Sequence, residues 1–447
     1  MRNVVCFLAI VLMCAFILVP TTGCPCLLDQ LAPPADGGDT GDTGDTGDTG
    51  DTGDTGDTGD TGDTGDTAGF TIVKTDIALR GDADLECGDD VIAFGTGVLT
   101  GVSYVVPSTN PTAGTPVTDS ALYSSKAFDV GGSTIFLVGA NTGSLLFQVS
   151  VFDVPTATIT QTFPATDLRL ANIPAAPDDI GHIQADGDYC VVRCDGNEVT
   201  DGKILKVIDV SGAAPALISF DVNPAGSGLA LRQVAVDAET KTVVAVADDM
   251  FHIYDINSPT AAPTQIAAPN GIGDVQIRIN NGYIIAFDNQ NYIEAFLVDL
   301  ATNSVVPLTD SLGLGEVGIG GGTFAFFANA DANDRGQRAA VGAVPGPGFT
   351  KAALDNQIDG STNNNGLVGF ASDLCIVPNG SYIFLSGAYL QYSPGTASFT
   401  VPADPQGIDP WACPAWDIDC SSNTVGFKTA PSAVGGSAES VGYIILP

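Results

Sequence analysis

Apolar and polar residues alternate in short runs along most of the chain. From Ala68 onward, β-branched and aromatic residues form runs that are separated by Gly, Asn, Asp and Pro. Short runs of this composition, bounded by turn-forming residues, predict β-strands joined by tight turns. The 54 Gly and 27 Pro residues also favour a turn-rich β protein over a helical one. The predicted fold class for residues 68–447 is therefore all-β.

The predicted strands recur in a repeated unit. One unit contains a short strand, a polar turn, an apolar strand, a loop, and a further apolar strand that often ends in Asp, as in Val207–Asp209 and Leu297–Asp299. The second strand of the unit occurs eight times, at Val91–Phe94, Thr134–Leu137, Tyr189–Val192, Val243–Val246, Tyr283–Ala286, Phe324–Phe327, Tyr382–Leu385 and, less clearly, Val425–Lys428. Successive starts lie 40 to 58 residues apart, so eight units fill the 380 residues of 68–447.

Repeats of this length with several strands each are typical of a β-propeller, in which sheets pack radially because one sheet cannot bury both of its faces alone. We expect eight blades, with seven as the alternative if the divergent segment Trp411–Pro447 is an extension. A β segment, Gly69–Val73, precedes the first unit, and the last unit stops after Val441–Leu446 without an outer strand. Pairing of these two segments would complete the last blade and remove an exposed edge.

Two units carry a family resemblance. Lys203–Pro215 reads KILKVIDVSGAAP and Phe251–Pro259 reads FHIYDINSP. Both resemble the LVIVD-type repeats of bacterial surface propellers. The resemblance covers two or three units and is degenerate in the others, and it implies no activity.

The N-terminus has the pattern of an export signal. Arg2 is followed by the apolar run Val4–Val19, which is shorter than the roughly 20 residues that span a bilayer. The sequence Thr22-Gly23-Cys24 resembles the end of a bacterial lipobox, which implies diacylation of Cys24; Thr21 departs from that pattern, because Leu is usual there. We therefore expect a signal peptide at 1–23, lipidation at Cys24 and a membrane-attached protein of the cell envelope. Cleavage of an ordinary signal peptide nearby is the alternative.

A low-complexity segment separates this signal from the folded part. Residues 24–37 form a short N-terminal segment, and residues 38–67 are ten consecutive Gly-Asp-Thr triplets. The triplets contain no apolar side chain to bury, and repeated Asp favours extension, so we expect a disordered tether. Gly at every third position also fits a collagen triple helix, which is the alternative.

The charge balance limits the class of partner. The chain has 15 Lys and Arg residues against 52 Asp and Glu residues, a net charge of −37. This surface repels phosphate backbones, so we expect no nucleic-acid partner. The only histidines are His182 and His252, and both are interpreted as packing or surface residues, which removes most His-based catalytic and zinc sites.

Cysteines of the folded part are candidates for disulfides. An exported protein can form them, and six cysteines allow fifteen pairings. Bonds that link Cys413 or Cys87 to Cys420 are competing expectations, whereas a straight strand would hold Cys190 and Cys194 too far apart. The six candidates are Cys87, Cys190, Cys194, Cys375, Cys413 and Cys420.

Other candidate sites are weaker. Trp411 and Trp416 could stack on a ligand or fill the last blade. Acidic residues from Asp82 to Asp90 and the polar run Asp359–Gly366 resemble partial Ca²⁺ loops, but neither completes the pattern, and solvated turns are the preferred interpretation. Arg80-Gly81-Asp82 is treated as a chance match. No cofactor is expected beyond this candidate Ca²⁺.

No motif specifies a reaction. The sequence contains no nucleophile elbow, metal-binding His pair or Gly-rich phosphate loop. We therefore expect a non-catalytic surface propeller that binds a protein or a glycan. The alternative is a hydrolase or lyase that acts on an extracellular polymer through carboxylates at the mouth of the propeller channel.

Overall fold

The computed structural model describes residues 71–446 apart from several loop segments, the longest being 165–182, 221–232, 351–373 and 401–417. The described residues belong to the second of two compact units, Thr61–Pro447. The predicted signal peptide, Cys24 and the Gly-Asp-Thr tether lie outside them. Within the described part of the chain, no helix is long and apolar enough to cross a membrane.

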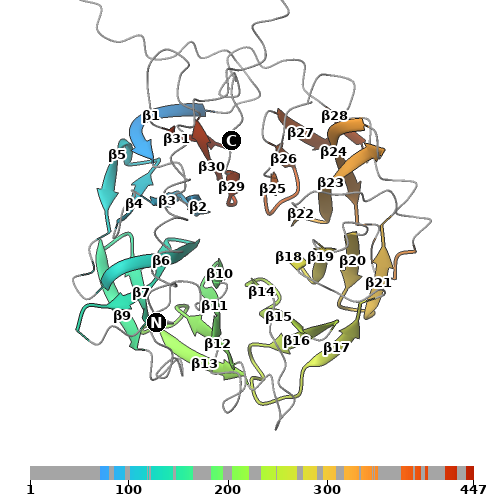
Figure 1. Ribbon diagram of the computed structural model, residues 1–447, viewed down its shortest axis with the longest axis horizontal. Helices are drawn as coiled ribbons and strands as arrows, with labels where there is room; N and C mark the ends of the chain where they lie inside the picture. Colours follow the sequence, from blue (N-terminus) through green and yellow to red (C-terminus); the bar gives the residue numbers. More distant parts are fainter. Residues whose placement is uncertain are drawn as a thin grey trace, which may run out of the picture. The chain divides into compact units, whose positions relative to one another are not determined.

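The described residues form eight antiparallel sheets, which we number in chain order (Figure 1). Sheet 1 contains β2 (Leu85–Gly88), β3 (Val91–Gly95), β4 (Val102–Val106) and β5 (Asn110–Pro116). Sheet 2 contains β6 (Leu122–Gly131), β7 (Thr134–Asn141), β8 (Phe147–Asp153) and β9 (Thr158–Pro164). Sheet 3 contains β10 (Ile183–Asp186), β11 (Tyr189–Cys194), β12 (Ile204–Asp209) and β13 (Ala216–Phe220). Sheet 4 contains β14 (Gln233–Asp237), β15 (Thr242–Ala247), β16 (Met250–Asp255) and β17 (Thr264–Ala267).

The remaining four sheets complete the set. Sheet 5 contains β18 (Val275–Asn280), β19 (Tyr283–Asp288), β20 (Ala295–Asp299) and β21 (Ser304–Pro307). Sheet 6 contains β22 (Val317–Gly320), β23 (Thr323–Asp331) and β24 (Asp334–Ala343). Sheet 7 contains β25 (Leu374–Ile376), β26 (Tyr382–Leu385), β27 (Ala388–Ser393) and β28 (Ser398–Thr400). Sheet 8 joins β1 (Thr71–Leu79) to β31 (Glu439–Ile445), β30 (Thr424–Thr429) and β29 (Ile418–Cys420).

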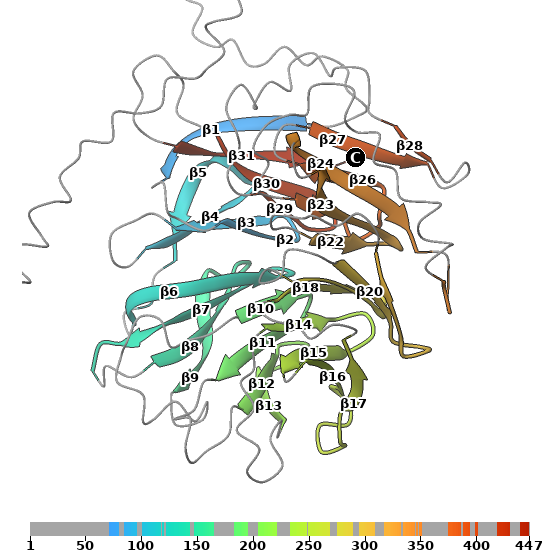
Figure 2. The ribbon, with the colours of Figure 1, turned by 45° about the vertical axis from the view of Figure 1, so that its right-hand side comes forward.

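The β-propeller prediction is confirmed. Each of the eight predicted apolar segments lies in the second strand of a different sheet. The first strands β2, β6, β10, β14, β18, β22, β25 and β29 each lie beside the first strand of the next sheet, and β29 also lies beside β2. The first strands therefore line a central axis, and the later strands of each sheet lie progressively outward (Figures 1 and 2).

The predicted ring closure is also confirmed. Strand β1 pairs with β31 in antiparallel register, with Thr71 opposite Ile445 and Leu79 opposite Glu439. The buried Thr75 hydroxyl adds a hydrogen bond of 2.7 Å to the carbonyl oxygen of Val441. The start of the folded part thus supplies the outer strand of the last sheet, which is visible beside β31 in Figure 2.

Apolar clusters lie between sheets. One cluster combines Phe136 and Val151 of sheet 2 with Cys190 and Ile208 of sheet 3. Corresponding clusters join sheets 1 and 2, 3 and 4, 4 and 5, 5 and 6, 7 and 8, and 8 and 1. This arrangement explains the nearly continuous apolar composition of the second strands, which are covered on both faces by neighbouring sheets.

The C-terminal end of a first strand contacts the next sheet in one of two ways. Gly88 of sheet 1 lies so close to sheet 2 that a Cβ atom there would overlap the carbonyl oxygen of Gly132. At the equivalent position of sheet 3, the Asp186 carboxylate instead accepts a hydrogen bond of 2.7 Å from the backbone N–H of Ala238 in sheet 4. Backbone contact through Gly and a side-chain bridge through Asp therefore perform the same joining function.

Candidate functional site

Strand register identifies one equivalent residue near the axis in every sheet. In sheet 1, Glu86 pairs with Ala93, the third residue of the second strand, and in sheet 2 Asp129 pairs in the same way with Phe136. We call the set of residues that pair with this third position the axial ring. Its members, from sheet 1 to sheet 8, are Glu86, Asp129, Gln184, Ala235, Arg278, Gly318, Cys375 and Asp419.

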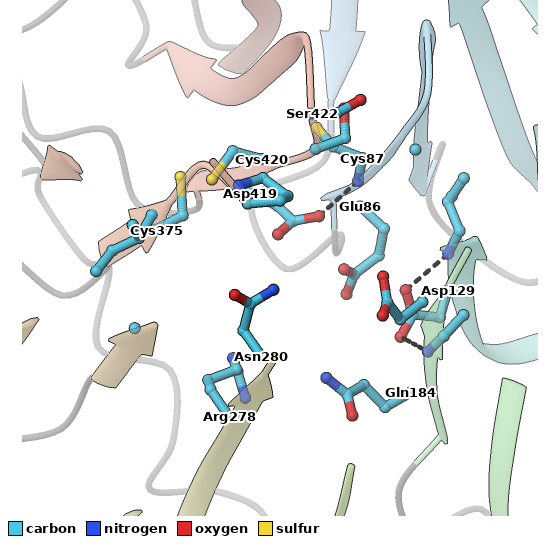
Figure 3. Close-up of a pocket in the computed structure, with 18 of the residues that line it drawn as sticks. Glu86, Cys87, Asp129, Gln184, Arg278, Asn280, Cys375, Asp419, Cys420 and Ser422 are labelled. Carbon is cyan, nitrogen blue, oxygen red and sulfur yellow. Dashed lines mark hydrogen bonds between the residues drawn. The ribbon is translucent and has the colours of Figure 1, made fainter. Parts of the chain in front are cut away.

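A cavity of about 480 Å³ lies at the axis and is lined by residues of the first strands of all eight sheets. Seven of the eight axial-ring residues line it, Ala235 being the exception. Figure 3 shows Glu86, Asp129 and Asp419 near one another, with Arg278 and Asn280 facing them across the opening. The volume is in the range of pockets that hold small ligands or single side chains.

The charges around this cavity are unequal. Three carboxyl groups of the axial ring come from the consecutive sheets 8, 1 and 2, whereas the guanidinium of Arg278 comes from sheet 5, halfway around the ring from sheet 1. Among the described lining residues, the acidic ones are Glu86, Asp89, Asp129, Asp186 and Asp419, and the only basic one is Arg278. Such a cavity attracts cationic groups and repels anions.

Several axial-ring side chains also hold the next sheet. The two carboxylate oxygens of Asp129 accept hydrogen bonds from the backbone N–H groups of Val130 at 2.6 Å and of Ala185 in sheet 3 at 2.8 Å. Asp419 accepts one of 2.6 Å from the N–H of Cys87 in sheet 1. Because these carboxylates bridge sheets, their positions are fixed by the fold before any ligand binds.

The protonation of Asp129 is unusual. Burial, reinforced by the nearby Asp419 carboxylate, raises the pKa of Asp129 to about 8, although two backbone N–H groups and Arg278 act to lower it. Burial likewise raises the pKa of Asp186. At neutral pH, Asp129 is therefore largely protonated, and the negative charge of the axial ring resides mainly on the other acidic groups.

The candidate metal and stacking sites receive no further support. Among the residues that the structure describes, no group of three or more His, Cys, Asp or Glu side chains could hold a metal ion. From the first candidate Ca²⁺ loop, Asp89 accepts a hydrogen bond from the Ser422 hydroxyl and Asp90 accepts one from the Ser108 backbone N–H. Asp82, Asp84, Asp359–Gly366, Trp411, Trp416 and His182 lie outside the described residues.

The cysteines are divided between two places. Cys190 is buried in the apolar cluster between sheets 2 and 3, as a free thiol. Cys87, Cys375 and Cys420 are free thiols on the first strands β2, β25 and β29, and all three line the axial cavity. Cys194 lies in β11, but its side chain is outside the described part of the chain. Cys413 lies wholly outside it.

Most of this site was missed by sequence reasoning. Asp129, Gln184, Arg278 and Asp419 each lie in a different repeat and share no motif, and Glu86 was considered only as a Ca²⁺ ligand. Alignment of the first strands on the predicted hairpins would have brought these residues to one position. His252 is buried in β16, as expected for a packing residue.

Comparisons with known proteins show the fold alone. No family model matches the chain, and no curated protein matches it. A solved structure titled "Crystal Structure of Mitotic Checkpoint Complex" includes a chain that is 11% identical, with a TM-score of 0.45, over 75% of this chain and 91% of that one. The β-propeller domain of the Trilobed protease from Pyrococcus furiosus is 7% identical, with a TM-score of 0.41, over 79% of this chain and 89% of that one. A prolyl endopeptidase structure is 13% identical, with a TM-score of 0.47, over 80% of this chain but only 52% of its own length.

Proposed function

We propose that this chain is an exported, non-catalytic binding protein whose axial cavity accepts a cationic group, such as a Lys or Arg side chain of a protein partner. The observation that carries the proposal is the lining of the cavity, in which four acidic residues besides the largely protonated Asp129 accompany one described basic residue, Arg278. A cationic side chain placed there gains attraction from several carboxylates inside a partly desolvated site. The amide oxygens of Gln184 and Asn280, which also line the cavity, accept backbone N–H groups of Val236 and Gly321, and each keeps a second lone pair that can accept a hydrogen bond from the ligand.

A binding titration tests this proposal with two variants that are expected to change the affinity in opposite directions. The full chain is titrated with tetralysine at 150 mM ionic strength, with tetraglutamine as the uncharged probe. Glu86→Gln should weaken tetralysine binding about tenfold, because one attractive charge is lost. Arg278→Gln should strengthen the same binding, because a repelling charge is removed.

The matched control removes a charge away from the cavity. Asp255 is exposed at the end of β16 and accepts a backbone hydrogen bond from Asn257, which Asn can also accept. Asp255→Asn should leave the affinity for tetralysine unchanged at 150 mM ionic strength, where the Debye length is about 8 Å. Equal responses of all three variants, or binding of neutral oligosaccharides with no response to tetralysine, would contradict a cationic ligand.

A polymer hydrolase or lyase is the second candidate function. It is favoured by the raised pKa of Asp129 beside Asp419, since a protonated carboxyl group next to an ionised one is the arrangement of glycoside hydrolysis. The hydrogen bonds to both oxygens of Asp129 argue against it, because a general acid needs an oxygen that faces the substrate. Release of reducing ends from a polysaccharide panel, lost in Asp129→Asn, would favour the enzyme.

The location of this binding protein rests on the N-terminal sequence. The run Val4–Val19 followed by Thr22-Gly23-Cys24 supports export and lipid attachment at Cys24, and residues 38–67 would then separate the propeller from the membrane. Two acyl chains make such attachment stable. Cys24→Ser should move the protein from the membrane fraction to the soluble fraction, whereas continued membrane association of this variant would point to another anchor.

A further inference from the structure

Side chains of the first strands alternate between the two neighbouring sheets. Axial-ring residues face the following sheet: Gln184 of sheet 3 bonds the N–H of Val236 in sheet 4 at 2.9 Å. The residue after the ring position faces the preceding sheet: the Cys87 sulfur of sheet 1 accepts a hydrogen bond of 3.1 Å from the N–H of Gly426 in sheet 8. This alternation follows from the two-residue period of a strand.

The same rule brings two thiols together. Cys375 occupies the ring position of sheet 7 and therefore faces sheet 8, whereas Cys420 follows the ring position of sheet 8 and therefore faces sheet 7. Their strands β25 and β29 are neighbours, and the two side chains share a hydrogen bond. Figure 3 shows the two sulfur atoms directed at one another.

We propose that Cys375 and Cys420 form a disulfide that links sheets 7 and 8 beside the ring closure. The bond forms by exchange with a disulfide of the folding compartment, R–S–S–R. Both thiols lose their protons, one S–S bond forms between Cys375 and Cys420, and two R–SH molecules are released, so the external disulfide takes up both electrons.

Cys87 is another candidate partner of Cys420, but its side chain is directed at strand β30. Its sulfur packs against Gly426 of β30, so closely that a Cβ atom on Gly426 would lie 2.6 Å from it. Cys87 thus faces the second strand of sheet 8, while Cys420 faces away from it toward sheet 7. The Cys87–Cys420 bond considered from the sequence would require both side chains to turn.

Burial determines when the bond can form. It raises the pKa values of both thiols, so few thiolates exist in the folded ring at neutral pH. Exchange needs a thiolate, so the bond forms during folding, before sheets 7 and 8 close on each other.

Peptide mapping tests the pairing directly. The full chain is expressed with its native N-terminal leader in a bacterial host that exports it. Free thiols are blocked with N-ethylmaleimide in the absence of reductant, and the chain is then cleaved before Asp residues. This cleavage separates Cys375 on residues 373–403, Cys413 on 409–416, Cys420 on 419–447 and Cys87 on 84–88. A species that joins 373–403 to 419–447 is expected. Blocked thiols at Cys375 and Cys420, or a link from Cys420 to Cys87 or Cys413, would overturn the proposal.

Thermal stability supplies a second measurement that does not depend on the map. A disulfide between Cys375 and Cys420 closes the loop of residues 375–420 and should raise the Tm by about 5 °C. Unfolding in strong reductant should therefore lower the Tm of the native chain and of Cys87→Ser by this amount, and leave the Tm of Cys375→Ser and Cys420→Ser unchanged. If reductant lowers the Tm of these last two variants equally, the bond lies elsewhere.

Discussion

Deletion of residues 71–79 should abolish cooperative folding of the propeller or lower its Tm by more than 10 °C. This deletion removes β1, which pairs with β31 along its length and buries Leu79 against the cluster between sheets 8 and 1. Loss of the apolar contacts of Val73, Ile77 and Leu79 alone should cost on the order of 5 kcal/mol. It also exposes the edge of β31, which invites aggregation. Differential scanning calorimetry and size-exclusion chromatography measure both effects.

The chain offers a control of the same length. Deletion of residues 41–49 removes three of the ten Gly-Asp-Thr triplets and should leave the Tm unchanged. Thr75→Val is a milder variant, which loses the buried hydrogen bond to Val441 and the bond that the Thr75 hydroxyl accepts from the N–H of Ile77, and should cost about 1–2 kcal/mol. If the β1 deletion unfolds with the native Tm, then β1 does not close the ring.

Gly88→Ala should lower the free energy of unfolding by about 3 kcal/mol. The added methyl group would overlap the carbonyl oxygen of Gly132 and the side chain of Val130, both in sheet 2. A backbone oxygen cannot turn aside as a flexible side chain can, so the first strands of sheets 1 and 2 must separate. The carbonyl of Gly132 also accepts a hydrogen bond of 2.7 Å from the N–H of Asp89, which this separation would break. Urea unfolding followed by far-ultraviolet circular dichroism measures the loss.

The comparison for this variant is Gly212→Ala. Gly212 lies in the turn between β12 and β13, where the nearest contact of an added Cβ atom is 3.6 Å from the Ala214 carbonyl oxygen. This variant should unfold with the native midpoint or slightly above it, because Ala restricts the unfolded chain more than Gly does. Equal stability of the two variants would show that sheets 1 and 2 do not meet at Gly88.

The fold could be predicted from sequence because its signal is repeated. Eight apolar segments, each bounded by turn residues, defined the second strands, and most of the described residues of those strands are buried. Ring closure by Gly69–Val73 could be predicted by counting strands. The last unit lacked an outer strand, and the Gly69–Val73 segment preceded the first unit without belonging to one. Periodicity thus carries the architecture even where two units share few residues.

The site could not be predicted in the same way. The axial ring combines one residue from each sheet, and its members range from Gly318 to Arg278, so composition gives no common pattern. Their meeting depends on the register of each hairpin, and a slip of one residue would turn each side chain to the other face. For the same reason the sequence left fifteen disulfide pairings open, whereas the alternation of side chains along the first strands places Cys375 and Cys420 toward each other, which is the basis of the proposed bond.

The proposed function depends on where a cationic ligand binds, and hydrogen exchange of the full chain with and without saturating tetralysine tests this most directly. We expect slower exchange to be concentrated in the first strands around the cavity, above all β2, β6, β10 and β29, and Glu86→Gln to reduce this protection. Protection confined to the outer strands β5, β9, β13 and β17, with the first strands unchanged, would contradict an axial binding site.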